Sequence, residues 1–207
     1  MTIRATIWDL GGVLIRTEDR APRTALADRY QMSYETLEDL FFGNERHEMG
    51  KRAQLGEITA AEAWDSVRRT LNASPEEMPA IRRAFFAGDR LDRELVGYIR
   101  SLRPEYKIGA ISNAIDDVRG RMEAEWEIAD AFDDIVISAE VGIMKPDPRI
   151  YQLSLAHLGL APRQAVFIDD SLRNIEAAKK LGLAAVHFHS PQQVLQELGR
   201  WMEGDSA

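Results

Sequence analysis

The sequence contains no cysteine. This absence excludes disulfide bonds, thiolate metal sites and a cysteine nucleophile within these 207 residues. Any chemistry must therefore come from carboxylates, hydroxyls, amides, imidazoles and amines.

Long apolar runs and an excess of positive charge are also missing. No run approaches the roughly 18 apolar residues that cross a bilayer, and residues 1–4 lead into a strand-like segment without a signal-peptide pattern. We therefore expect a cytoplasmic protein with no membrane partner. The 26 Lys and Arg against 34 Asp and Glu give a net charge of −8. Because such a surface repels phosphate backbones, we expect no nucleic-acid partner either.

Short apolar segments alternate with longer stretches of helical periodicity, a pattern typical of βαβ units in a parallel sheet. The expected strands cover residues 5–8, 107–111, 135–138, 165–168 and 184–188. Helices are expected over residues 91–102, 148–158, 172–181 and 191–202. The pattern predicts an α/β fold, a three-layer Rossmann-like parallel sheet with helices on both faces.

The stretch between the first and second expected strands is too long for one crossover helix. Apolar residues three and four apart predict helices over 21–30, 34–42, 60–71 and 75–87, and a charged loop over 43–56. We expect an inserted helical domain at 16–90 within an α/β core formed by 1–15 and 91–207. Its amphipathic helices can bury their apolar faces within one chain or across a dimer, so both a monomer and a homodimer stay open.

Polar side chains follow four of the expected strands. In chain order they are Asp9 with Gly11 and Gly12, Ser112 with Asn113, Lys145, and the pair Asp169 and Asp170. Ligands of open parallel sheets bind beyond the carboxyl ends of the strands. We therefore expect these residues to form one site.

The residue types at this site indicate its chemistry. Three carboxylates at one sheet edge repel each other unless a cation lies among them, and oxygen ligands favour Mg²⁺. Lys145 and Ser112 would hold an anion, and the flexible backbone at Gly11 and Gly12 could turn amides toward it. A carboxylate such as Asp9 beside Mg²⁺ and a lysine is suited to attack phosphorus and form an aspartyl-phosphate. These residues predict a Mg²⁺-dependent phosphatase of a small phosphorylated metabolite.

With these residues in this order, the sequence resembles the haloacid dehalogenase-like hydrolase superfamily. Four segments between Thr6 and about Phe188 carry the resemblance, at residues 8–14, 111–113, 144–146 and 167–171. The helical insertion resembles the family's C1-type cap. The subgroup resembles sugar-phosphate phosphatases and the phosphatase domain of soluble epoxide hydrolase, which suggests a sugar phosphate as substrate.

The resemblance also implies roles for single residues. Asp9 would be the nucleophile, and Ser112 and Lys145 would bind the phosphoryl group. Implied metal ligands are Asp9, the backbone carbonyl of Gly11, and Asp170 directly, with Asp169 next to it. Implied substrate contacts come from Gly11, Gly12, Ser112, Asn113 and Lys145. Arg52 in the insertion is a further candidate, facing hydroxyls or a second anion.

The chain departs from the family pattern at Gly11, where these hydrolases usually carry a second aspartate that protonates the leaving group. Losing a positioned proton donor costs typically 10²- to 10⁴-fold in rate. Candidate replacement acids on the insertion are Glu18, Asp19, His47 and Glu48. The alternative function is a catalytically impaired module that binds a phosphoryl ligand or a protein.

A metal-independent haloacid dehalogenase is the third hypothesis. Such enzymes resemble Ser-Ser-Asn where this chain has Asp169, Asp170 and Ser171. The paired acids favour magnesium and phosphorus over this hypothesis.

Overall fold

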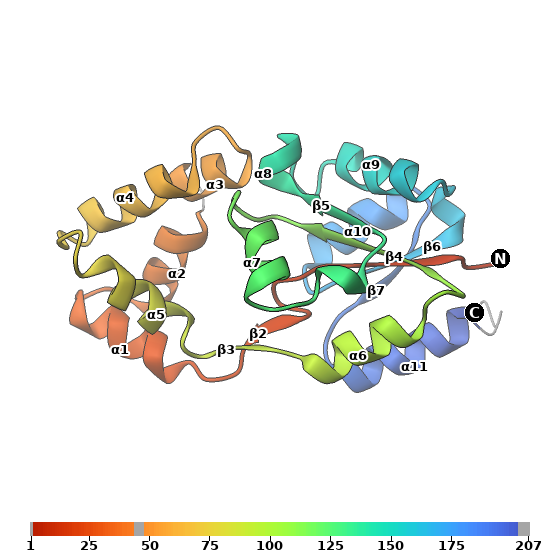
Figure 1. Cartoon of the computed structure of the whole chain (residues 1–207), viewed down its shortest axis with the longest axis horizontal. Coiled ribbons are helices and arrows are strands. Elements are labelled where there is room, and N and C mark those ends of the chain that lie inside the picture. Colours follow the sequence, from red (N-terminus) through yellow and green to blue (C-terminus); the bar gives the residue numbers. More distant parts are fainter. Residues whose placement is uncertain (1, 44–47, 203–207) are drawn as a thin grey trace.

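The computed structural model describes residues 2–43 and 48–202. Figure 1 shows an α/β core beside a unit composed of helices. Within the described residues, no helix is both long enough and apolar enough to span a membrane.

The core is built on one five-stranded parallel sheet with the order β5-β4-β1-β6-β7. Its strands are β1 (Ala5–Trp8), β4 (Lys107–Ser112), β5 (Asp134–Ile137), β6 (Ala165–Asp169) and β7 (Ala184–His187). Trp8 at the end of the central strand pairs with Ala110 and Ile168. This register brings the carboxyl ends of β1, β4 and β6 to the same edge, where the polar side chains were expected to meet.

Helices cover both faces of this sheet (Figure 1). One face packs against α6 (Arg93–Ser101), α7 (Val118–Ala124) and α11 (Pro191–Met202). The other packs against α9 (Pro148–Leu158) and α10 (Leu172–Lys180). Successive strand residues point to opposite faces of the sheet, so Ile168 packs into the first helical layer and Phe167 into the second. The predicted three-layer α/β fold is confirmed.

The helical unit comprises α1 (Ala21–Arg29), α2 (Tyr34–Phe42), α3 (Glu48–Gln54), α4 (Ala60–Thr70) and α5 (Met78–Phe86). It has an apolar cluster of its own, in which the ring of Phe41 stacks on that of Phe85 with centroids 3.7 Å apart. Thr59 and Glu62 form a capping box that fixes the start of α4.

Two short strands connect the helical unit to the core. β2 (Ile15–Thr17) and β3 (Asp89–Leu91) pair antiparallel, and the Thr17 hydroxyl donates to Asp89 at 2.7 Å. The domain boundaries expected at 15/16 and 90/91 fall within this pair of strands.

Several expected element boundaries were wrong. The helix expected to begin at Leu91 begins at Arg93, because Leu91 pairs with Ile15 and the Asp92 carboxylate caps the helix by accepting from Leu95 N at 2.8 Å. The strand expected over 135–138 is β5 one residue earlier. Ser138 instead begins the short helix α8 (Ser138–Val141).

The segment expected to be a charged loop over 43–56 contains α3. Gly50 allows this helix to approach the preceding segment, since a Cβ there would lie 2.5 Å from Gly43 N. The helix α7 and the 3-10 helices η1 (Ala129–Ala131) and η2 (Pro162–Gln164) were also not expected.

Candidate active site

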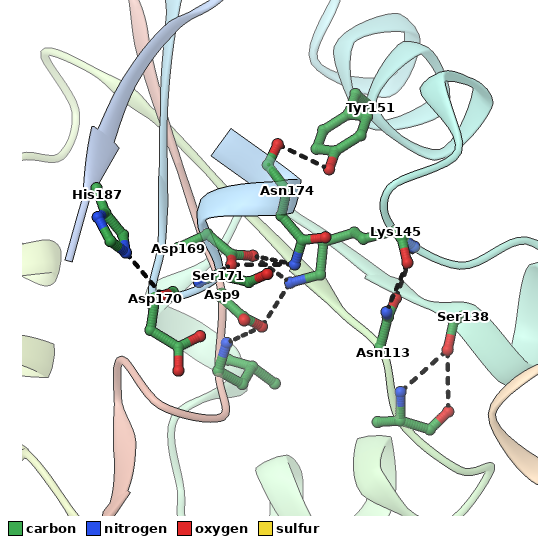
Figure 2. Close-up of polar contacts among 12 residues, drawn as sticks. Asp9, Asn113, Ser138, Lys145, Tyr151, Asp169, Asp170, Ser171, Asn174 and His187 are labelled. Carbon is green, nitrogen blue, oxygen red and sulfur yellow. Dashed lines mark hydrogen bonds and ion pairs between the residues drawn. The ribbon is translucent and has the colours of Figure 1, made fainter. Parts of the chain in front are cut away.

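The site lies at the carboxyl edge of the sheet. Asp9 follows β1 directly, Ser112 is the last residue of β4, and Asp169 is the last residue of β6. Lys145 comes from the loop between α8 and α9. Figure 2 shows the side chains of Asp9, Lys145 and Asp169 pointing toward one another.

Lys145 bridges two carboxylates. Its side chain is 1% exposed, and Nζ lies 2.7 Å from Asp9 Oδ1 and 2.7 Å from Asp169 Oδ2. Burial alone would lower the pKa of Lys145, but Asp9 and Asp169 outweigh it and hold that pKa above its usual value. The lysine is therefore a fixed positive charge between two acids.

Asp9 is harder to ionise than an ordinary aspartate. Burial raises its pKa to about 8, Lys145 opposes this rise, and the charges of Asp169 and Asp170 add to it. Asp9 Oδ1 also accepts a hydrogen bond of 2.7 Å from Leu10 N. A further positive charge at this position would favour the carboxylate form that a nucleophile requires.

Asp169 is fully buried and its oxygens are already engaged. Oδ1 accepts from Ser171 N at 2.8 Å and from Asn174 Nδ2 at 3.0 Å, while Oδ2 accepts from Lys145 and from Asn174 Nδ2 at 3.1 Å (Figure 2). The fixed carboxylate of Asp169 therefore orients the Lys145 ammonium, which also pairs with Asp9.

Asp170 differs from its neighbour because its side chain is more exposed and points away from Lys145 (Figure 2). Its backbone carbonyl accepts a hydrogen bond of 2.9 Å from His187 Nε2, which holds Asp170 beside the end of β7. Its carboxylate lies against Gly12, where a Cβ would come within 2.2 Å of Asp170 Oδ2. The glycine thus makes room for this carboxylate.

Asp9, Asp169 and Asp170 each place one carboxylate oxygen within 4.8 Å of the others. Burial first, and then the charge of Asp169, raises the pKa of Asp170, so these acids repel one another when ionised. A hard divalent cation would relieve this repulsion. Asp9 and Asp170 are the better placed ligands, because the oxygens of Asp169 already accept from three protein groups.

Two side chains hold the loops around the site. Asn113 Oδ1 accepts from Lys145 N at 2.7 Å, and Asn113 Nδ2 donates to Lys145 O at 2.9 Å. Ser138 Oγ accepts from Ala114 N at 3.0 Å. The side-chain amide of Asn113, an expected substrate contact, therefore positions the loop that carries Lys145.

A cavity of about 820 Å³ opens at this edge between the core and the helical unit. From the strand ends it is lined by Gly11, Gly12, Ser112 and Asn113. Arg52 does not line it and instead donates to Glu57 at 3.2 Å on the surface. Four of the six expected substrate contacts therefore line this cavity, whereas Lys145 and Arg52 do not.

The three replacement acids that the structure describes do not line the large cavity either. Asp19 Oδ1 accepts from Ala21 N at 2.9 Å, and neither Glu18 nor Asp19 lines the large cavity. Glu48 lines a separate cavity of about 140 Å³ inside the helical unit, and His47 falls outside the described residues.

Sequence reasoning missed the acids that line the large cavity, which are Asp89, Asp117 and Glu125. Asp117 is the N-cap of α7, and its Oδ1 is buried without a hydrogen-bond partner among the described residues. Its position shortly after the strand end at Ser112 was the available signal.

The parallel sheet carries a carboxylate, a lysine and further carboxylates at its carboxyl edge, and a helical insertion follows the first strand. This arrangement is that of a class of hydrolases with a Rossmann-like core. The chain belongs to the haloacid dehalogenase-like hydrolase family, whose model matches residues 3–182.

Among curated proteins, the chain is 27% identical over 221 residues to bifunctional epoxide hydrolase 2 of Mus musculus, covering 96% of this chain and 38% of that protein. It is 25% identical to a sesquiterpene phosphatase of Aspergillus oryzae, covering 95% of each. The chain spans between 6% and 38% of the length of several other curated relatives.

Among solved structures, a HAD family enzyme of Bacteroides thetaiotaomicron matches with a TM-score of 0.78 at 23% identity, covering 97% of this chain and 100% of that one. The same enzyme has been solved with magnesium and inorganic phosphate. At this identity the match shows the shared fold.

Proposed function

We propose that the chain is a Mg²⁺-dependent phosphatase that hydrolyses a small phosphorylated metabolite through an aspartyl-phosphate on Asp9. The observation that carries this proposal is the buried Lys145 held between Asp9 and Asp169 beside the outward-facing Asp170. Two comparisons support it. The relative from Aspergillus oryzae is named a sesquiterpene phosphatase, and the enzyme of Bacteroides thetaiotaomicron has been solved with magnesium and inorganic phosphate.

In the proposed reaction an oxygen of Asp9 bonds to phosphorus while the bond from phosphorus to the alcohol oxygen breaks. The departing oxygen takes a proton from water or from an acid at the cavity. Water then attacks the phosphorus of the aspartyl-phosphate, which releases inorganic phosphate and restores Asp9.

The neighbouring residues bind and orient the phosphoryl group. Lys145 supplies a fixed positive charge and the Ser112 hydroxyl supplies a hydrogen-bond donor. Mg²⁺ would be held by Asp9, the carbonyl of Gly11 and Asp170, with Asp169 behind them, and would neutralise negative charge on the phosphoryl oxygens.

Removing the metal ligand Asp170 tests the magnesium requirement. We expect a chelator to abolish phosphate release, and Asp170→Asn to raise the Mg²⁺ concentration for half-maximal activity by at least about 10- to 100-fold, the scale on which even the loss of an outer-shell partner of a metal ligand acts. Magnesium titrations of p-nitrophenyl phosphate hydrolysis measure this. Asp28→Asn, which removes an exposed carboxylate on α1, is the matched control. A titration curve that is the same in Asp170→Asn and Asp28→Asn would reject this ligand assignment.

The effect of magnesium on stability is expected to depend on pH. Because the folded-state pKa of Asp9 is about 8 against a usual 3.8, the metal-free folded chain binds more protons than the unfolded chain between these values. Its stability therefore falls as pH rises through that window. Mg²⁺ favours the carboxylate, so its stabilisation should be larger at about pH 8 than at about pH 6. Thermal unfolding with and without Mg²⁺ checks this, and Asp9→Asn should remove the difference.

The alternative function, an impaired binding module, rests on Gly11. A Cβ at Gly11 would meet no atom within 4 Å, and its φ is not positive, so Gly11→Asp is sterically allowed. We expect this variant to raise the rate on ordinary alkyl phosphates by roughly 10²-fold or more. The rate on p-nitrophenyl phosphate should change little, because its leaving group hardly needs a proton.

Phosphate release from both esters separates the possibilities. No gain on alkyl phosphates would mean that another group already donates the proton. A native chain inactive on both esters, with turnover only in Gly11→Asp, would favour the binding module. Gly12→Ala contrasts sterically with Gly11→Asp, because a Cβ at position 12 would collide with the carboxylate of Asp170.

A further inference from the structure

We infer that the alcohol released by this phosphatase is hydrophobic, so that the substrate is the phosphate monoester of a long aliphatic or aromatic alcohol rather than of a sugar. The inference rests on the proposed function and specifies its substrate class. It comes from the walls of the large cavity beyond the strand ends.

One wall of this cavity is aromatic. Five aromatic side chains line the cavity, four of them from the helical unit and Trp126 from the core beside Arg121; we call these residues, Phe41, Phe42, Trp64, Phe86 and Trp126, the aromatic wall. Rings from three helices of the unit meet there, with centroids of Trp64 and Phe86 6.2 Å apart and those of Phe42 and Phe86 6.4 Å apart. Phe42 is 44% exposed, a large apolar side chain facing an open cavity. Covering this surface with an apolar group would be favourable.

Most charged side chains at the cavity already have partners. Arg23 pairs with Asp89 at 2.9 Å, and Arg16 pairs with Asp92 at 2.8 Å. Arg121 pairs with Glu125 at 2.8 Å. The hydroxyls of a bound sugar would have to compete with these pairs.

Other polar groups at the cavity are also engaged. Arg90 donates to the carbonyls of Ala87 and Asp89, and Gln54 donates to the carbonyl of Phe42. Trp64 Nε1 and Asp117 Oδ1 are buried polar atoms without a partner among the described residues. A sugar brings several hydroxyls, which lose affinity when they are buried without a hydrogen-bond partner.

The volume of the cavity also suits a substrate larger than a small sugar. Its volume of about 820 Å³ lies in the upper part of the roughly 300–1,000 Å³ range of pockets for drug-sized ligands. A small sugar would leave the aromatic wall in contact with water.

A homologous series of alkyl phosphates tests the inference. Butyl, hexyl, octyl and dodecyl phosphate release alcohols of nearly equal basicity, so they differ mainly in apolar surface. We would measure their binding to Asp9→Asn with Mg²⁺, by tryptophan fluorescence and below the concentrations at which they form micelles. Trp64 and Trp126 in the aromatic wall should report occupancy.

We expect affinity to rise roughly two- to fourfold per buried methylene, and glucose 6-phosphate to bind no more tightly than butyl phosphate. A flat or absent response along the series, or tighter binding of glucose 6-phosphate than of dodecyl phosphate, would overturn the inference. Phosphate release by the native chain is measured in parallel. Inactivity on every ester would reject the proposed function, whereas the binding series still decides what the cavity accepts.

Phe42→Ala removes an exposed part of the aromatic wall. It should weaken dodecyl phosphate binding several-fold more than butyl phosphate binding. Leu195→Ala on α11 is the matched control, because Leu195 is also a large exposed apolar residue, at 36%, but does not line the cavity. Equal dependence on chain length in Phe42→Ala and Leu195→Ala would count against the aromatic wall as the binding surface.

Discussion

Replacing Asp9 with asparagine is expected to lower phosphate release by at least about 10⁴-fold, the scale on which losing a covalent nucleophile acts. An amide oxygen cannot form the proposed acyl-phosphate, and the substitution also removes a proposed metal ligand. The rate with p-nitrophenyl phosphate and Mg²⁺ measures the loss. Because this ester hardly needs a proton donor, the result does not depend on what replaces the acid missing at Gly11.

Asp28→Asn serves as the control here also, because it removes one exposed carboxylate of α1 that does not line the site. It should keep the native rate. Circular dichroism checks that Asp9→Asn is folded, which we expect because neutralising Asp9 also removes the cost of burying its charge. A folded Asp9→Asn protein with an unchanged Mg²⁺-dependent rate would exclude Asp9 as the nucleophile.

The polar residues at the strand ends could be predicted because a simple geometric rule governs them. Buried parallel strands are short apolar runs, and their carboxyl ends share one edge. Strand boundaries that were correct to within about one residue were therefore enough to predict that Asp9, Ser112 and Asp169 lie at this edge. The membership of the family followed from the same segments, and the match over residues 3–182 confirms it.

The bridging position of Lys145 could not be predicted from its sequence neighbours. The lysine lies in a loop, and its burial depends on contacts that the loop makes across the fold. The Asn113 amide fixes its backbone, while Asn174 holds Asp169 against it. Such contacts join residues that no local periodicity connects.

The substrate side of the cavity was predicted least well. Arg52 was selected for its charge, but a nearby Glu57 pairs with it at the surface. Trp126 and Asp117 were missed because α7 carries Gly120 in its interior and has little apolar periodicity. A sugar phosphate was suggested by the subgroup alone, whereas the side chains of the aromatic wall favour a hydrophobic alcohol.

Replacing Lys145 with methionine is expected to destabilise the fold by about 3–5 kcal/mol at neutral pH, the usual cost of removing one partner from a buried ion pair. Methionine fills similar space, but it leaves Asp9 and Asp169 facing each other without the cation that lies 2.7 Å from each. Urea unfolding of the metal-free chain measures the loss. Phosphate release should fall as well, because the phosphoryl group loses its fixed positive charge.

The cause of this destabilisation can be separated from lost packing. If unpaired charge is responsible, the double variant with Lys145→Met and Asp169→Asn should recover part of the stability, because one carboxylate is then neutral. The loss in Lys145→Met should also grow as pH rises above about 8, because the Asp9 carboxyl of the native chain then loses its proton and gains its charge partner in Lys145, whereas the variant has no such partner. Lys179→Met, an exposed lysine on α10, should stay within about 0.5 kcal/mol of the native chain. A Lys145→Met protein as stable as Lys179→Met would show that Asp9 and Asp169 do not carry the opposing charges on which the proposed site depends.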